Sequence, residues 1–258
     1  MQQPSFIWIP LVTMVRKETD RFIRLWTQTL LPSVITSVLY FVIFGSFIGS
    51  QIPPINGVTY MAFIVPGLVM MALVTNSFAN TVTSFFFSKF QKSIEELLVS
   101  PMPVWVMLLG FTLGGVARGV LVGLLVLAVS LFFTHIAVAH LLLGIVFMIL
   151  SATLFSLAGL LNGIFAKNFD QVSIVPTFVL TPLIYLGGVF YSIEALSPFW
   201  QTVSKFNPIL YIINGFRYSF LGFSDVSITA SFAVLISITI LFAIVSFHLL
   251  TVGKGIRQ

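Results

Sequence analysis

The feature that most constrains this chain is the length of its stretches without charge. Residues 25–88 form a run of 64 residues with no Asp, Glu, Lys or Arg. Four further long charge-free runs follow, at 97–117, 119–166, 171–193 and 226–253. Only 7% of the 258 residues are charged, whereas a soluble domain carries about 25%. Such a chain cannot cover a globule with a soluble surface, so we expect it to fold in a lipid bilayer.

The charge-free runs divide into six segments long enough to cross a membrane. A spanning helix needs about 20 apolar residues, and turn or polar residues at 51–57 and 134–140 interrupt the two longest runs. The apolar residues do not alternate as they do in a membrane barrel, so helices are predicted. The fold class predicted for 1–258 is a single all-α polytopic membrane domain, with spans at 29–50, 59–84, 104–133, 141–165, 172–192 and 228–250.

The basic residues predict the orientation of these spans. Cytoplasmic loops next to spans carry an excess of Lys and Arg. With the N-terminus inside, nine basic residues lie inside, namely Arg16, Lys17, Arg21, Arg24, Lys89, Lys92, Lys167, Lys254 and Arg257. Only Lys205 and Arg217 lie outside. Both termini are therefore expected in the cytoplasm, and the net charge of +5 predicts anionic lipid headgroups rather than nucleic acid as a partner.

The segment before the first span, 11–28, is amphipathic. Its apolar residues near one helical face are Leu11, Met14, Val15, Phe22, Leu25 and Trp26. Its charged residues, mostly on the other face, are Arg16, Lys17, Asp20, Arg21 and Arg24. This pattern predicts a helix lying in the membrane interface; the alternative is an ordinary solvated basic face.

The loop after the second span predicts a short cytoplasmic helix over 85–98. Its apolar residues Phe90, Ile94, Leu97 and Leu98 recur at the spacing of one helical face, and Ser100-Pro101 follows as a stop signal. Lys89, Lys92, Glu95 and Glu96 fill the remaining positions. Such a surface can dock a partner protein, or it can pack only against its own spans.

The outer segment 193–225 is too apolar for a free loop and too interrupted for a span. It carries eight aromatic residues, and Pro198, Pro208, Gly215 and Gly222 break it up. We expect a helical hairpin that dips partly back into the membrane, with its backbone ends buried in protein.

Several kinds of chemistry are missing from the sequence. The six spans contain no Asp, Glu or Lys, which argues against a proton-coupled or ion-coupled carrier. The sequence has no G-x-x-x-x-G-K-[ST] phosphate loop, so ATP hydrolysis by this chain is not expected. His135 and His140 are badly spaced for zinc and have no carboxylate nearby in the sequence. Neither a catalytic residue nor a metal site is predicted.

A few polar residues inside the spans are candidates for a transport path. Arg118 is the one charge within a span, beside Gly115, Gly119 and Gly123, whose spacing of four favours close helix packing. Arg118 either bonds carbonyls of a neighbouring helix or lines a polar path. Two further polar rows occur on the second and fifth spans, formed by Asn76, Asn80 and Thr83 and by Thr177, Thr181 and Tyr185.

The order of these elements resembles the type-2 ABC exporter permeases. Local strings carry the resemblance, namely FIVPGL at 63–68, IEELLVSP at 94–101, NPILY at 207–211 with GFRY at 215–218, FSLAGLLNG at 155–163 and LGGVFY at 186–191. The last two are closest to one bacterial branch of that family. Each string is mostly apolar and weak alone, and the specific feature is their order along essentially the whole chain.

The resemblance implies partners and roles that spacing alone does not. Two copies of the chain would pair, and each would meet one copy of a separate ATPase subunit that holds ATP and Mg²⁺. Segment 85–98 would be the coupling helix, meeting the ATPase through Lys89, Phe90, Lys92, Ile94, Glu95, Glu96 and Leu97. The second and fifth spans would face the other protomer, and the outer hairpin would include Glu194, Asn207, Pro208, Tyr211 and Arg217.

The expected function is therefore export of an amphiphilic or hydrophobic substrate across a bacterial inner membrane, driven by a partner ATPase. Two alternatives remain on the sequence alone. A self-sufficient channel or secondary carrier predicts flux through the purified chain. A scaffold or enzyme subunit predicts a stable partner that is not an ATPase.

Overall fold

The structure is a computed structural model that describes residues 5–135, 138–253 and 255. Lys254 and Arg257, which the charge bias places in the cytoplasm, lie outside the described residues. Helical elements follow one another as α1 (Ser5–Arg24), α2 (Trp26–Thr29), α3 (Leu31–Tyr40), η1 (Phe41–Ile48), η2 (Gly49–Gln51), α4 (Tyr60–Phe90), α5 (Ser93–Val99), α6 (Val104–Ser130), α7 (Leu141–Phe165), α8 (Phe169–Ile174), η3 (Val175–Leu180), α9 (Thr181–Tyr185), η4 (Ile193–Ala195), α10 (Pro198–Lys205), α11 (Pro208–Leu221) and α12 (Ile228–Val252).

Five of the predicted spans are helices long and apolar enough to cross a membrane. They are Trp26–Gln51, Tyr60–Phe90, Val104–Ser130, Leu141–Phe165 and Ile228–Val252. The all-helical architecture, with several helices long and apolar enough to cross a membrane, is therefore confirmed. The second of these helices runs six residues beyond its predicted end at 84, and the third ends three residues before its predicted end at 133.

The remaining predicted span, 172–192, differs from the prediction. The helical segment here is shorter, Phe169–Tyr185, and consists of α8, the π-helix η3 and α9. Pro182 has no N–H that could bond to the carbonyl four residues earlier. The N–H of the preceding residue, Thr181, bonds to the carbonyl of Pro176, five residues back, which is the π-helical pattern. The helix ends at Tyr185 because Gly187 and Gly188 turn the chain, with φ of +79° at Gly188.

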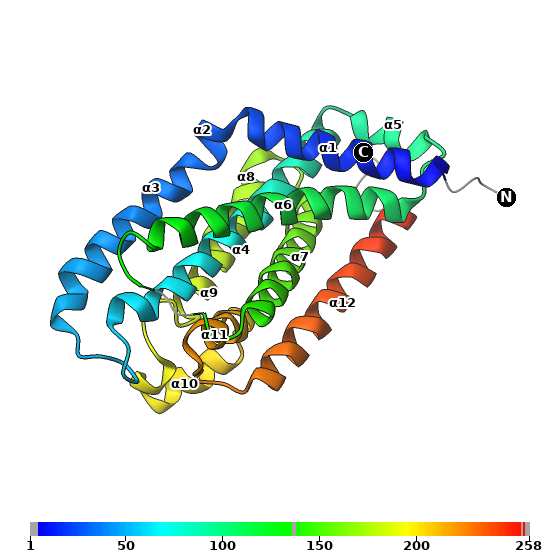
Figure 1. The fold of residues 1–258 in the computed structure, drawn as a ribbon. Helices are drawn as coiled ribbons and strands as arrows, with labels where there is room; N and C mark the ends of the chain where they lie inside the picture. Colours follow the sequence, from blue (N-terminus) through cyan, green and yellow to red (C-terminus); the bar gives the residue numbers. More distant parts are fainter. Residues whose placement is uncertain (1–4, 136–137, 254, 256–258) are drawn as a thin grey trace.

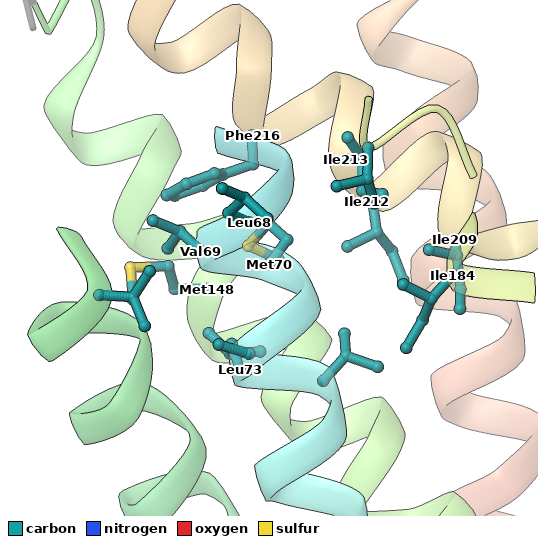
Figure 2. Close-up of a cluster of buried hydrophobic side chains, with 14 of the residues drawn as sticks. Leu68, Val69, Met70, Leu73, Met148, Ile184, Ile209, Ile212, Ile213 and Phe216 are labelled. Atoms are coloured by element: carbon teal, nitrogen blue, oxygen red, sulfur yellow. The ribbon is translucent and has the colours of Figure 1, made fainter. Parts of the chain in front are cut away.

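Helix α4 is the centre of the bundle, and 78% of the residues in its most apolar 18-residue stretch are buried. Its side chains pack against α6, α7 and α11, and Figure 2 shows Leu73, Met148 and Phe216 in this cluster. Figure 1 shows α1, α5 and the end of α12 at one end of the bundle and α10 and α11 at the other. The elements that the sequence assigns to the cytoplasm thus share one end.

Glycines allow the close approach of α6 and α7 to α4. A Cβ on Gly119 would lie 1.8 Å from Oγ of Ser77, and one on Gly115 would lie 2.2 Å from Oγ1 of Thr81. On α7, a Cβ on Gly159 would lie 2.5 Å from the backbone oxygen of Phe78. The packing role predicted for the glycine repeat of α6 is confirmed.

Segment 11–28 belongs to a longer helix that breaks near its predicted end. Helix α1 already begins at Ser5, and the chain bends at Leu25 before α2. Met14 and Phe22 are buried as the pattern predicts, whereas Leu25 and Trp26 are exposed. The Cβ atom of Met14 lies 2.8 Å from where a Cβ on Gly110 would be, so α1 lies directly on α6.

The single helix predicted over 85–98 is wrong, because the segment is divided between two helices. Residues up to Phe90 continue α4, Lys92 takes a left-handed conformation with φ of +59°, and α5 begins at Ser93. The spacing of Phe90 and Ile94 fits either arrangement. A straight helix would carry Ile94 away from the bundle, whereas the turn folds it back until 1% of its surface is exposed.

The outer segment 193–225 contains a helix pair, as predicted. Helix α10 is largely exposed, and Phe199, Trp200 and Phe206 face outward. Helix α11 is buried along most of its length and packs on α4, α7 and α12.

Candidate functional site

Helix α5 presents an acidic face at the end of the bundle where α1 begins. Glu95 and Glu96 are exposed, and Leu97 is half-buried. Ile94 anchors the helix in a cluster with Met14, Phe85 and Met107. Both carboxylates lie in the first turn of α5, where the helix dipole favours negative charge. A helix that is anchored by Ile94 and exposes two carboxylates is suited to docking a basic surface.

Two of the predicted coupling residues lie at the end of α4 rather than on α5. Lys89 is buried, and its Nζ donates to the backbone oxygens of Ile164 and Ala166, both at 2.9 Å. Through these two hydrogen bonds it caps the C-terminal end of α7. Phe90 is 63% exposed.

Phe90 belongs to an aromatic cluster rather than to α5. Its ring centroid lies 5.1 Å from that of Phe169, at the start of α8. Phe86 and Phe87 of α4 contact the same ring at 4.9 and 5.4 Å. The end of α4 thus contacts both the end of α7 and the start of α8.

Replacing Lys89 by methionine should lower the free energy of unfolding by about 1.5 kcal/mol, because two carbonyls at a helix end lose a charged donor. Lys92→Met is the matched control, since Lys92 is exposed, and it should change stability by less than about 0.5 kcal/mol. Unfolding in mixed detergent micelles measures both. Equal effects of the two substitutions would contradict the capping role.

A buried polar cluster joins α1 to α4. Glu18 is 2% exposed and accepts hydrogen bonds from Oγ of Ser84 and from Nη2 of Arg21, the latter at 2.9 Å. The same Arg21 nitrogen donates to Oδ1 of Asn80 at 2.9 Å and to its backbone oxygen at 3.2 Å. Beneath Glu18, its Cβ lies 2.5 Å from where a Cβ on Gly114 would be. Helix α1 is therefore bonded to α4.

The sequence analysis missed Glu18, although a signal for it was present. Glu18 is four residues from both Met14 and Phe22, so it lies on the face of α1 that those residues bury. An acidic residue on the apolar face of an amphipathic helix indicates a polar partner in the protein. Here the partners are the hydroxyl of Ser84 and the guanidinium of Arg21.

Arg118 lies on α6, one turn after Gly114, which contacts Glu18. Its Nη2 donates to the backbone oxygen of Thr29 at 3.1 Å and to Oδ1 of Asn76 at 3.0 Å. Thr29 is the last residue of α2, where the chain bends and a helix-end carbonyl needs a donor. The amide of Asn76 donates in turn to Oγ of Ser33 at 3.0 Å. These contacts favour the structural alternative for Arg118.

The structure does not bring the two predicted polar rows together. Asn76 and Asn80 are buried and bonded to arginines within the chain, and Thr83 is half-buried. On the fifth segment, Thr177, Thr181 and Tyr185 are all exposed. The Tyr185 hydroxyl lies 3.1 Å from that of Tyr40, which joins α9 to the end of α3. Within one copy, only the fifth segment offers its row to an outside surface.

The outer hairpin residues have mainly structural contacts. Asn207 caps α11 by accepting from the N–H of Ile209 at 3.0 Å, and its amide donates to the Leu183 carbonyl at 2.6 Å. Pro208 is the first residue of α11, and the Tyr211 hydroxyl donates to the Lys205 carbonyl at 2.8 Å. Glu194 is exposed.

Arg217 is fully buried, although the charge count treats it as an outer-loop cation. Its guanidinium lies 4.0 Å from the centroid of the Phe63 ring, and Nη2 donates to the Gly188 carbonyl at 2.6 Å. Asp225, which the sequence analysis did not single out, accepts from Oγ of Ser192 and the N–H of Ile193, both at 2.9 Å. Arg217 and Asp225 thus hold the turn after α9 against α4 and α11.

The described residues include no group of three or more His, Asp or Glu side chains placed to hold a metal ion. The chemistry that the arrangement offers is docking and polar contact between helices.

Comparisons with known proteins agree with this arrangement. A sequence profile of the family described as ABC-2 type transporter matches residues 10–221. The inner membrane transport permease YadH of Escherichia coli (strain K12) is 54% identical over 251 residues, which are 97% of this chain and 98% of that protein. Nodulation protein J of Rhizobium leguminosarum bv. trifolii is 23% identical over 202 residues, 76% of this chain and 77% of that protein.

Proposed function

Since the chain belongs to the ABC-2 type transporter family and is the non-catalytic permease subunit of such a transporter, we propose that α5 is the helix on which its ATPase subunit docks. Permeases of this family work with ATPase subunits. The observation that carries the proposal is the exposed pair Glu95 and Glu96 on a helix anchored by Ile94. The alternatives of a self-sufficient carrier or an enzyme subunit do not fit the family.

The topology that we propose has six crossings, with Phe169–Tyr185 as the short fifth one. Helix α1 would lie in the cytoplasmic interface, α10 and α11 would form the outer re-entrant hairpin, and both termini would be cytoplasmic. The arrangement of the two ends in Figure 1 supports this assignment. The membrane is the bacterial inner membrane, as the name of the Escherichia coli relative indicates.

The working assembly that we propose contains two copies of this chain and two ATPase subunits, which bind ATP and Mg²⁺. Because α4 is mostly buried within its own chain, the path face is assigned to the fifth segment. There Thr177, Thr181 and Tyr185 lie beside the exposed Phe178 and Val179. A surface that mixes hydroxyl groups with apolar side chains suits an amphiphilic substrate, which the assembly would export.

Reversing both charges of α5 tests the docking role. The double variant Glu95→Lys, Glu96→Lys should insert normally and retain about tenfold less ATPase subunit on co-purification, because two repulsive contacts replace two attractive ones. The matched control is Glu194→Lys, an exposed glutamate after the fifth segment, which should leave ATPase retention unchanged. Normal ATPase retention and normal transport by the double variant would refute the proposal.

A further inference from the structure

A cavity lies beside the second half of α7. It has a volume of about 390 Å³ and is bounded by α4, α7, the η3–α9 segment and α12. Its walls include Phe78, Ala158, Val179 and Phe242, and its one amide side chain is Asn162. The Nδ2 atom of Asn162 already donates to the Val172 carbonyl at 3.1 Å. The cavity therefore offers apolar contact and little polar recognition.

The cavity is about as long as one leaflet of a membrane is thick. On α7 its lining runs from Leu154 to Phe165, which is about 16 Å along a helix that rises about 1.5 Å per residue. One leaflet contributes about 15 Å of hydrocarbon, half of the core thickness of about 30 Å. The length of the cavity therefore matches that of one acyl chain.

A lysine follows, two residues later in the sequence, the residue that ends the cavity lining on α7. That residue is Phe165, which is 59% exposed, and the lysine is Lys167, also exposed. In the orientation proposed above, this end of α7 is cytoplasmic. The ion pairs among the described residues are Arg16–Asp20 and Arg21–Glu18. Lys167 therefore forms no ion pair with another described residue. A lysine at the headgroup level attracts the phosphate of a lipid.

We propose that this cavity is a lipid site that holds one acyl chain of a phospholipid from the cytoplasmic leaflet, with its phosphate at Lys167. The inference rests on the orientation of the proposed function but does not depend on the ATPase. Apolar walls, a leaflet-long shape and a cation at one end together fit a phospholipid. A hydrophobic cargo would share the apolar walls, but it has no reason to match the length of one leaflet or to need Lys167.

Filling the cavity should displace the lipid. The chain is purified from vesicles of phosphatidylglycerol and phosphatidylethanolamine, washed in mild detergent, and its retained phospholipid is measured by native mass spectrometry. Ala158→Phe should lower phospholipid retention by about tenfold, the loss expected when two methylene groups lose their apolar contacts. The matched control, Ala128→Phe, changes an exposed alanine of α6 outside the cavity and should retain lipid as the parent protein does.

A surface variant keeps the test valid if Ala158→Phe fails to fold. Lys167→Gln should lower the retention of phosphatidylglycerol relative to phosphatidylethanolamine by about fivefold, the effect of one lysine near anionic lipid. Full lipid retention by a folded Ala158→Phe protein, or an unchanged lipid ratio in Lys167→Gln, would overturn the proposal. So would native masses that show a transported compound in place of phospholipid. Retained ATPase binding in both variants would separate this result from a failure of the proposed function.

Discussion

Replacing Gly159 by alanine should lower the free energy of unfolding by about 3 kcal/mol. The added Cβ would lie 2.5 Å from the carbonyl oxygen of Phe78 and 3.2 Å from the amide nitrogen of Val82. Both atoms belong to the backbone of α4, so neither moves without shifting the helix. Since α4 is the centre of the bundle, the separation of α7 from α4 would loosen the packing on both.

The control is the same substitution at Gly123, where the nearest atom is the flexible Cε of Met148 at 3.1 Å. Both variants gain up to about 1 kcal/mol of helix propensity, and their difference therefore isolates packing against α4. Unfolding in mixed micelles of dodecyl sulfate and a mild detergent measures both proteins. Equal stabilities of Gly159→Ala and Gly123→Ala would contradict the packing described for α7.

Replacing Glu18 by alanine should lower the free energy of unfolding by about 2.5 kcal/mol. The variant removes the carboxylate that accepts from Ser84 and Arg21, and a half-buried guanidinium loses its counter-charge. Breaking a buried pair by removing one member costs about 3–5 kcal/mol, and the 30% exposure of the Arg21 side chain reduces this cost. The Cβ that contacts Gly114 is retained, so the change tests the charge rather than the packing.

Asp20→Ala is the matched control, because it also removes an acid from α1. The pair of Asp20 with Arg16 spans 3.7 Å with side chains 60% and 81% exposed, and such surface pairs contribute about 0–1 kcal/mol. Its effect should stay below about 0.5 kcal/mol. The same micelle assay compares the two. A loss on Asp20→Ala as large as that on Glu18→Ala would show that α1 is not attached to α4 through Glu18.

The sequence predicts those parts of the fold that depend on local pattern. Long charge-free runs locate the ends of the five long helices to within six residues because the bilayer core requires apolar side chains. The spacing of Gly115, Gly119 and Gly123 predicts close packing because small residues on one helix face allow backbones to approach. These features need no knowledge of which element lies next to which.

The features that the sequence does not predict depend on a specific neighbour. The turn at Lys92 exists because Ile94 finds an apolar cluster to enter, and helix spacing alone does not reveal that cluster. The burial of Arg217 depends on the Phe63 ring and the Gly188 carbonyl, both distant in sequence. The polar row on the fifth segment is exposed and that on α4 is largely buried because α4 lies at the centre of the bundle, which local sequence does not reveal.

The contacts of Lys89 and Phe169 have a mechanical consequence. Lys89 fastens the last turn of α4 to the end of α7, and Phe169 at the start of α8 rests on three phenylalanines of the same turn. The turn after α4 and the turn after α7, which are more than seventy residues apart in the sequence, are thereby held together. If the ATPase subunit docks on α5 as proposed, a displacement of α5 would reach the fifth segment directly through these contacts.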